Sequence, residues 1–195
     1  MKNENDLIES LNLSNQLTLE DIPNIDLYMD QVIQLFENKF ADSKRNDEEK
    51  VLTKTMINNY AKGKLFFPIK NKKYSKEHLI LISLIYQMKG ALSINDVKLT
   101  LEELNAKVPD GEIRLQDLYR SYLDLMDKNN TMFKEDIKEH MIDVNKKVKE
   151  LNQKDEAYLE QLLLVSTFSS MSNYYRRAAE KMVDDMRKDS DKDET

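Results

Sequence analysis

The sequence predicts an all-α protein, and its composition provides three observations in favour of this class. The 195 residues include only three Gly and three Pro, which disfavours a turn-rich β architecture. Ten Met accompany many Lys, Glu and Leu, all of which are side chains that favour helices. Hydrophobic residues make up 40% of the chain and charged residues 34%, so a modest core can lie beneath a heavily charged surface. We therefore expect a folded, helical chain.

Composition also excludes several kinds of chemistry. The absence of Cys rules out disulfides, thiolate zinc sites and cysteine nucleophiles. Of the two histidines, His78 is expected as a neutral imidazole on a helix surface, and His140 has no second type of metal ligand beside it. The sequence motifs of phosphate-binding loops, dinucleotide sites, zinc and serine hydrolases and EF-hands are missing. We expect no enzyme activity, no cofactor and no metal.

The beginning of the chain and its hydropathy bear on its location. The first residues lack the basic region, the apolar region and the cleavage site of a secretory signal. No apolar run approaches the roughly 20 residues that span a bilayer. We expect a cytoplasmic protein that does not enter a membrane.

The first predicted domain covers residues 22–106 and follows an N-terminal arm over residues 1–21. Asp26 is the expected N-cap of its first helix. The loop over residues 41–50 contains no large apolar residue and should be solvated. The buried face of the helix has the spacing i, i+3, i+4, i+7 and consists of Met29, Val32, Ile33, Phe36 and Phe40.

A short helix follows, with Thr53 as its expected N-cap and Gly63 as the left-handed residue that ends it. Its inward face is predicted to consist of Met56, Ile57 and Tyr60, and its outward face of Thr55, Asn58, Asn59 and Lys62. Next, Pro68 and the lack of helical periodicity predict an extended, turned segment over residues 65–74.

Two further helices complete this domain. Ser75 should begin the first, whose run LILISLIYQM is too densely apolar for a surface helix and is placed at the centre of the core. Ser93 should begin the second, with Asp96 at the capping-box position. Its apolar stripe consists of Ile94, Val97, Leu101 and Leu104. The break at residues 109–111, where Pro and Gly fall together, is the predicted domain boundary.

Residues 112–188 are predicted to form a C-terminal helical domain, followed by a disordered tail over residues 189–195. Within this domain, residues 129–131 allow a kink or a restart of the helix. Two stretches alternate apolar spacings of four and three, which is typical of a helical hairpin or a coiled-coil seam. They are Ile137, Met141, Val144, Val148 and Leu151, followed by Leu164, Phe168, Met171, Tyr175, Ala178 and Met182. The same apolar seam can pair two helices of one chain or two chains of a homodimer, and the sequence does not distinguish these two arrangements.

The charge distribution is uneven. Residues 51–74, here called the basic segment, contain six Lys and no Asp or Glu, so they carry +6 while the other 171 residues sum to −12. Clustered cations on an acidic protein are expected where phosphates are neutralised. The simpler explanation is a solvated lysine-rich loop.

The runs TMINNYAKGKLFFP, KKYS and KEHLILISLIYQMKGALSINDVKLTLEEL resemble the DNA-binding domain of MerR-type transcription regulators. The matching residues are Ile57 and Tyr60 in the helix, Leu65 and Phe66 before Pro68, Lys72, Tyr74 and Ser75 at the end of the wing, and Leu92, Ser93, Ile94 and Val97 at the helix junction. This resemblance implies a winged helix-turn-helix, with residues 64–74 as the wing. The sequence departs from that family at Asn58 and Asn59, which replace an arginine and an aromatic residue that contact DNA, and its wing is shorter.

From about Ile22 to Leu104, the runs DIPNIDLYMDQV, LTKTMINNYAKGKL and KKYSKEHLI resemble the bacterial domain of unknown function 1836 family, a resemblance that implies no activity. We therefore predict a transcription regulator that binds double-stranded DNA and dimerises through its C-terminal helices, with no identified effector. The predicted DNA-binding residues are Lys54, Thr55, Asn58, Asn59, Lys62, Lys64, Lys70, Lys72, Lys73 and Tyr74. The alternative is a non-enzymatic interaction module that binds an acidic protein through the same face.

Overall fold

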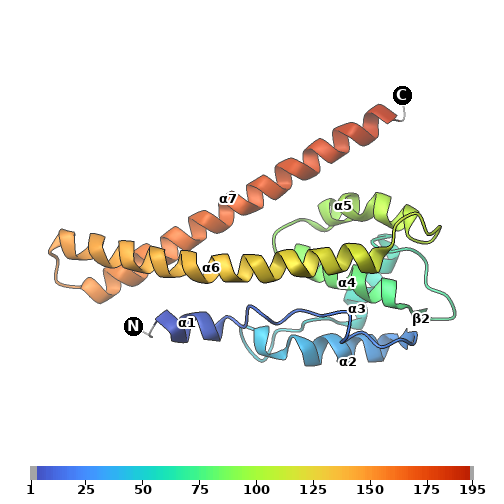
Figure 1. Ribbon diagram of the computed structural model, residues 1–195, viewed down its shortest axis with the longest axis horizontal. Helices are drawn as coiled ribbons and strands as arrows, with labels where there is room; N and C mark the ends of the chain where they lie inside the picture. Colours follow the sequence, from blue (N-terminus) through green and yellow to red (C-terminus); the bar gives the residue numbers. More distant parts are fainter. Residues whose placement is uncertain (1–3, 194–195) are drawn as a thin grey trace. The chain divides into compact units, whose positions relative to one another are not determined.

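The computed structural model describes residues 4–193, most of which lie in helices, and so agrees with the predicted helical character. The helices are α1 (Glu4–Ser10), α2 (Met29–Lys39), α3 (Lys54–Lys62), α4 (Lys76–Met88), α5 (Ile94–Lys107), α6 (Leu115–Leu151) and α7 (Glu156–Asp193), with a 3-10 turn η1 (Ala41–Ser43) (Figure 1). Two short strands, β1 (Leu27–Tyr28) and β2 (Lys73–Tyr74), form an antiparallel pair. For residues 4–193, no helix is both long enough and apolar enough to cross a lipid bilayer.

The chain packs into two units. The larger comprises residues 15–123 and 179–193, and the smaller comprises residues 4–14 and 124–178. The predicted tail over residues 189–195 falls partly outside the described residues, and α7 continues to Asp193.

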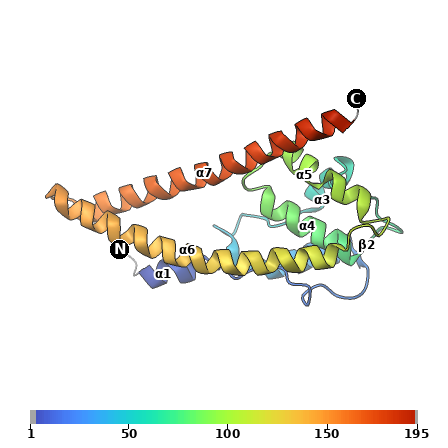
Figure 2. The same ribbon diagram turned by 45° about the horizontal axis from the view of Figure 1, so that its top comes forward.

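Helix α4 lies at the centre of the larger unit, as its apolar density predicted. Residues 79–82 and Ile85 are at most 1% exposed. Residues from α2, α3, α5 and the start of α6 surround them, and Figure 2 shows α3, α4 and α5 grouped together. These partners include Val32, Phe36, Ile57, Tyr60, Val97, Leu101, Leu115 and Tyr119.

The small sheet was not predicted and changes the start of α2. Leu27 pairs with Tyr74, and Tyr28 pairs with Lys73. Because residues 27–28 are extended in this sheet, the helix begins at Met29, and the prediction of Asp26 as its N-cap was wrong. The Tyr28 N–H instead donates to Gln31 Oε1 at 2.8 Å. Strands of two residues have no measurable period, so the sequence pattern could not reveal them.

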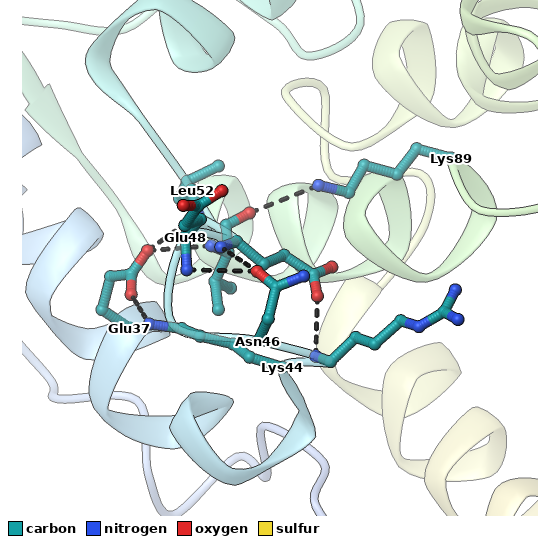
Figure 3. A network of polar contacts seen from close by, with 9 residues as sticks. Glu37, Lys44, Asn46, Glu48, Leu52 and Lys89 are labelled. Atoms are coloured by element: carbon teal, nitrogen blue, oxygen red, sulfur yellow. Dashed lines mark hydrogen bonds and ion pairs between the residues drawn. The ribbon is translucent and has the colours of Figure 1, made fainter.

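A long connection over residues 40–53 joins α2 to α3, and Glu37 on α2 holds its far end (Figure 3). Glu37 Oε1 accepts the N–H of Val51 at 2.8 Å, and its Oε2 lies 2.6 Å from Lys44 Nζ. The Lys44 ammonium lowers the pKa of the Glu37 carboxyl. On the other side, Lys89 Nζ donates to Val51 O at 3.3 Å. The connection is much longer than the roughly 3–4-residue turn of a helix-turn-helix, but these contacts hold the start of α3 in place.

The larger core extends beyond the predicted domain limits of 22 and 106. Leu17 is fully buried, and Tyr119 on α6 is 1% exposed. The Tyr119 hydroxyl donates its single hydrogen to Leu17 O at 2.7 Å. The Ser83 hydroxyl, which lies 2.9 Å from Tyr119 Oη, must therefore be the donor in the second bond. The division between the units therefore falls within α6, between residues 123 and 124, rather than at residues 109–111. That break is a turn between α5 and α6, with Gly111 at φ +75°.

The smaller unit packs α1 against the second half of α6 and the first half of α7. Helix α6 is continuous through residues 129–131, so the helix does not restart there, and Asn130 Nδ2 donates to Leu13 O at 2.8 Å. The buried seam consists of Ile8, Ile137, Met141, Val144, Val148 and Leu164.

Only part of the predicted seam is packed within the chain. Leu151, Tyr175 and Met182 are 51%, 73% and 70% exposed, respectively. The part that packs joins α6 to α7 of the same chain, next to their connection at residues 152–155.

Candidate nucleic-acid interface

Helix α3 has the orientation that the sequence predicted. Thr53 is its N-cap, and its Oγ1 accepts the N–H of Met56 at 3.1 Å. Ile57 and Tyr60 are buried, at 0% and 5% exposed. The exposed residues of the helix include Lys54, Thr55, Asn58, Asn59 and Lys62. The outward face therefore offers hydroxyl, amide and ammonium groups and no carboxylate.

The end of α3 differs from the prediction in one residue. Gly63 has φ −73°, and the left-handed residue is Lys64, with φ +57°. The Lys64 N–H donates to Ala61 O at 3.1 Å and the Leu65 N–H to Tyr60 O at 3.0 Å, which is the pattern of a Schellman motif. Gly63 is needed for space rather than for conformation, because a Cβ there would lie 2.7 Å from Leu65 Cδ1.

The wing, residues 64–74, is held at its base and exposed at its tip. Leu65 is buried, and Asn105 Nδ2 on α5 donates to its carbonyl oxygen at 2.8 Å. At the tip, the Lys73 N–H donates to Lys70 O at 2.9 Å across Asn71 and Lys72, which have φ +51° and +59°. Positive φ at both central residues is typical of a type I′ turn. Lys70, Asn71 and Lys72 are exposed there.

Tyr74 does not belong to the exposed surface, so its predicted contact with DNA was wrong. Its side chain is 1% exposed, and burial raises the pKa of its hydroxyl. The ring meets Phe66 edge-on at 6.1 Å between centroids. Tyr74 instead anchors the end of the wing to the core.

His78 also differs from its predicted surface position, because it is only 4% exposed. Its Nδ1 accepts the N–H of Ser75 at 3.1 Å, and its Nε2 lies 3.1 Å from Phe67 O. The proton must therefore be on Nε2, and the ring is neutral. Ser75 is the N-cap of α4 and His78 its third residue, so the Ser-x-x-His spacing was the signal that we missed.

The cations of the basic segment divide into two groups. Lys54 Nζ lies 2.8 Å from Asp30 Oδ1 in an exposed ion pair, and Lys73 Nζ lies 5.2 Å above the ring of Tyr28. Within residues 4–193, none of the other four has an ion-pair partner; these are Lys62, Lys64, Lys70 and Lys72. The same part of the chain contains no group of His, Asp and Glu that could hold a metal ion.

These features define a helical domain with a short polar helix and a cationic wing on its surface. Residues 17–122 match the family described as a domain of unknown function, DUF1836, and include α3, the wing and the helices that support them. The match covers more than half of the chain, which therefore belongs to this family. Comparisons with curated proteins and with solved structures give no match.

Proposed function

We propose that this protein is a cytoplasmic, non-enzymatic transcription regulator that binds double-stranded DNA through a MerR-like winged helix-turn-helix. One observation carries the proposal: four lysines without ion-pair partners among the described residues lie on α3 and the wing, next to the carboxylate-free outward face of α3. Unpaired cations attract phosphates, and amide side chains can hydrogen-bond base edges.

In this proposal α3 enters the major groove. Asn58 and Asn59 offer amides that can bind adenine in a bidentate manner, and Thr55 offers a hydroxyl. The wing lysines and Lys62 bind backbone phosphates. Lys54 and Lys73 contribute less, because DNA would have to compete with Asp30 and Tyr28 for their ammonium groups.

A homodimer is part of the proposal. The exposed side chains of Tyr175 and Met182 on α7 lie at positions of the predicted seam that this chain does not cover. A second chain that covered them would form a coiled-coil contact. Two-fold symmetry would then let two α3 helices bind half-sites about 34 Å apart along DNA.

The test is retention of the protein on random duplex DNA at about 50 mM and about 200 mM salt. The variant Lys70→Glu/Lys72→Glu reverses two exposed charges at the wing tip. The control Lys128→Glu/Lys134→Glu makes the same charge change at exposed positions of α6. We expect salt-sensitive retention by the native protein and the control, and loss of retention in the wing variant. Affinity should fall with a slope of roughly −0.9 per neutralised phosphate on logarithmic axes.

A second candidate function is an interaction module for an acidic protein partner. It is favoured by the exposed amides of Asn58 and Asn59, which stand on the same face where MerR-type regulators carry an arginine and an aromatic residue that contact DNA. Absence of retention by the native protein at about 50 mM salt would reject DNA binding and favour this alternative.

A further inference from the structure

Six residues in the described part of the chain have a left-handed backbone. They are Asn12, Lys64, Asn71, Lys72, Gly111 and Asn152, with φ between +48° and +75°. A Cβ disfavours this conformation, and Gly and Asn tolerate it best. Four of the six are Gly or Asn, so the chain generally uses a tolerant residue there. The two exceptions are lysines, and both belong to the wing.

Lys64 occupies the first position after the cap of α3, where the Schellman motif strongly prefers Gly. Its side chain is exposed and, within residues 4–193, has no ion-pair partner. Among the described residues, no ion pair of the Lys64 side chain therefore offsets the cost of its left-handed backbone.

Lys72 occupies the second central position of the turn at the wing tip. Type I′ turns strongly prefer Asn followed by Gly at their two central positions. Asn71 fits the first preference, and Lys72 departs from the second. It is likewise exposed and without an ion-pair partner in the described part of the chain.

We propose that Lys64 and Lys72 are the phosphate anchors of the wing, and that the fold retains lysine at two positions that favour glycine because these lysines hold one ammonium group at the base of the wing and one at its tip. The inference rests on the proposed DNA binding and assigns its principal electrostatic contacts to these two residues. Sparsely populated backbone conformations persist only where the surrounding structure holds them, and they cluster at functional sites. Glycine at both positions would remove the conformational strain of the left-handed backbone, and it would also remove both cations.

The test compares Lys64→Gly, Lys72→Gly and the double variant with the native protein in urea unfolding and in DNA binding over a range of salt. We expect unfolding midpoints at or above that of the native protein. We also expect weaker DNA binding, with a salt slope that is flatter by roughly 0.9 for each lysine removed.

Two controls separate backbone from charge. Asn152→Gly alters a left-handed residue outside the wing and should leave DNA binding unchanged. Lys64→Gln/Lys72→Gln keeps the backbone strain and should weaken DNA binding as much as the double glycine variant does, without a rise in the unfolding midpoint. A fall in the midpoint of the glycine variants overturns the inference, as does native DNA affinity and slope in the double glycine variant. Absence of DNA binding by the native protein rejects the proposed function itself.

Discussion

His78 is a buried imidazole that connects the wing to the start of α4. Its ring lies 4.1 Å from that of Phe67 and 6.0 Å from that of Tyr74 between centroids. Protonation at Nδ1 would place two N–H groups against each other, because the Ser75 N–H already points at this nitrogen. Burial lowers the pKa of the His78 imidazole and outweighs the opposing effects of its hydrogen bond to Phe67 O and of the carboxylates of Glu77 and Asp26. The folded protein thus requires the neutral ring.

This requirement predicts a pH-dependent stability. The unfolded chain should take up a proton at His78 near the ordinary pKa of 6.5, whereas the folded protein should not. The free energy of unfolding should therefore fall as the pH drops below that value, until the lowered pKa of the folded state is reached. Above the unfolded-state pKa of 6.5, the stabilising contribution of the neutral His78 ring is fully present.

Urea unfolding at about pH 7.5 and about pH 5.5 measures this effect. In His78→Gln, the amide oxygen can still accept the Ser75 N–H, but the side chain does not titrate, so the difference between the two pH values should shrink. An unchanged difference in His78→Gln would contradict the assignment.

At the scale of single elements, α3 is a helix of nine residues that depends on its ends and its buried face. Isolated helices shorter than about 12–15 residues are marginal in water. The Thr53 cap, the Schellman bonds at Lys64 and Leu65, and the buried side chains of Ile57 and Tyr60 therefore hold this helix together.

Thr53→Ala should lower the free energy of unfolding by about 1 kcal/mol, because the Met56 N–H loses its acceptor. Thr53→Ser keeps the hydroxyl and should retain most of the stability. Thr55→Ala, on the exposed face of the same helix, should have little effect on stability. Urea unfolding followed by circular dichroism makes the comparison; equal stability of the alanine and serine variants at position 53 would show that the cap is not needed.

At the scale of the whole molecule, the buried hydroxyl of Tyr119 links three segments that are distant in sequence. It connects α6 to Leu17 before α2 and to Ser83 at the centre of α4. Burial raises the pKa of Tyr119 to about 12, so the hydroxyl remains protonated and able to donate at physiological pH. This bond explains why the core of the larger unit includes the start of α6.

Tyr119→Phe should lower the free energy of unfolding by about 1–3 kcal/mol, since Leu17 O and the Ser83 hydroxyl would lose a buried partner. Tyr122→Phe is the matched control. Tyr122 stacks on Tyr119 at 5.7 Å between centroids, but within the described residues its hydroxyl has no hydrogen bond. Equal losses in the two variants would contradict a role for the Tyr119 hydroxyl.

The local features of the fold were predictable because local bonds decide them. Thr53, Ser75 and Ser93 were predicted as helix N-caps and are N-caps. The density of apolar residues placed α4 in the core, and the spacing of apolar residues in α3 gave its correct outward face. Of the ten predicted contact residues, eight are exposed, Lys73 is half-buried and Tyr74 is buried. The burial of Tyr74 follows from its packing on Phe66 and the core, which no spacing within the wing reveals.

The sequence by itself determined the helical class, the position of most helices and the segregation of lysines into residues 51–74. Helix caps, apolar periodicity and charge act over a few residues and can be read in order along the chain. Only the tertiary structure decided the burial of Tyr74 and His78 and the inclusion of Leu17 and Tyr119 in one core. These features depend on contacts between segments far apart in the chain, whose energies no local pattern contains.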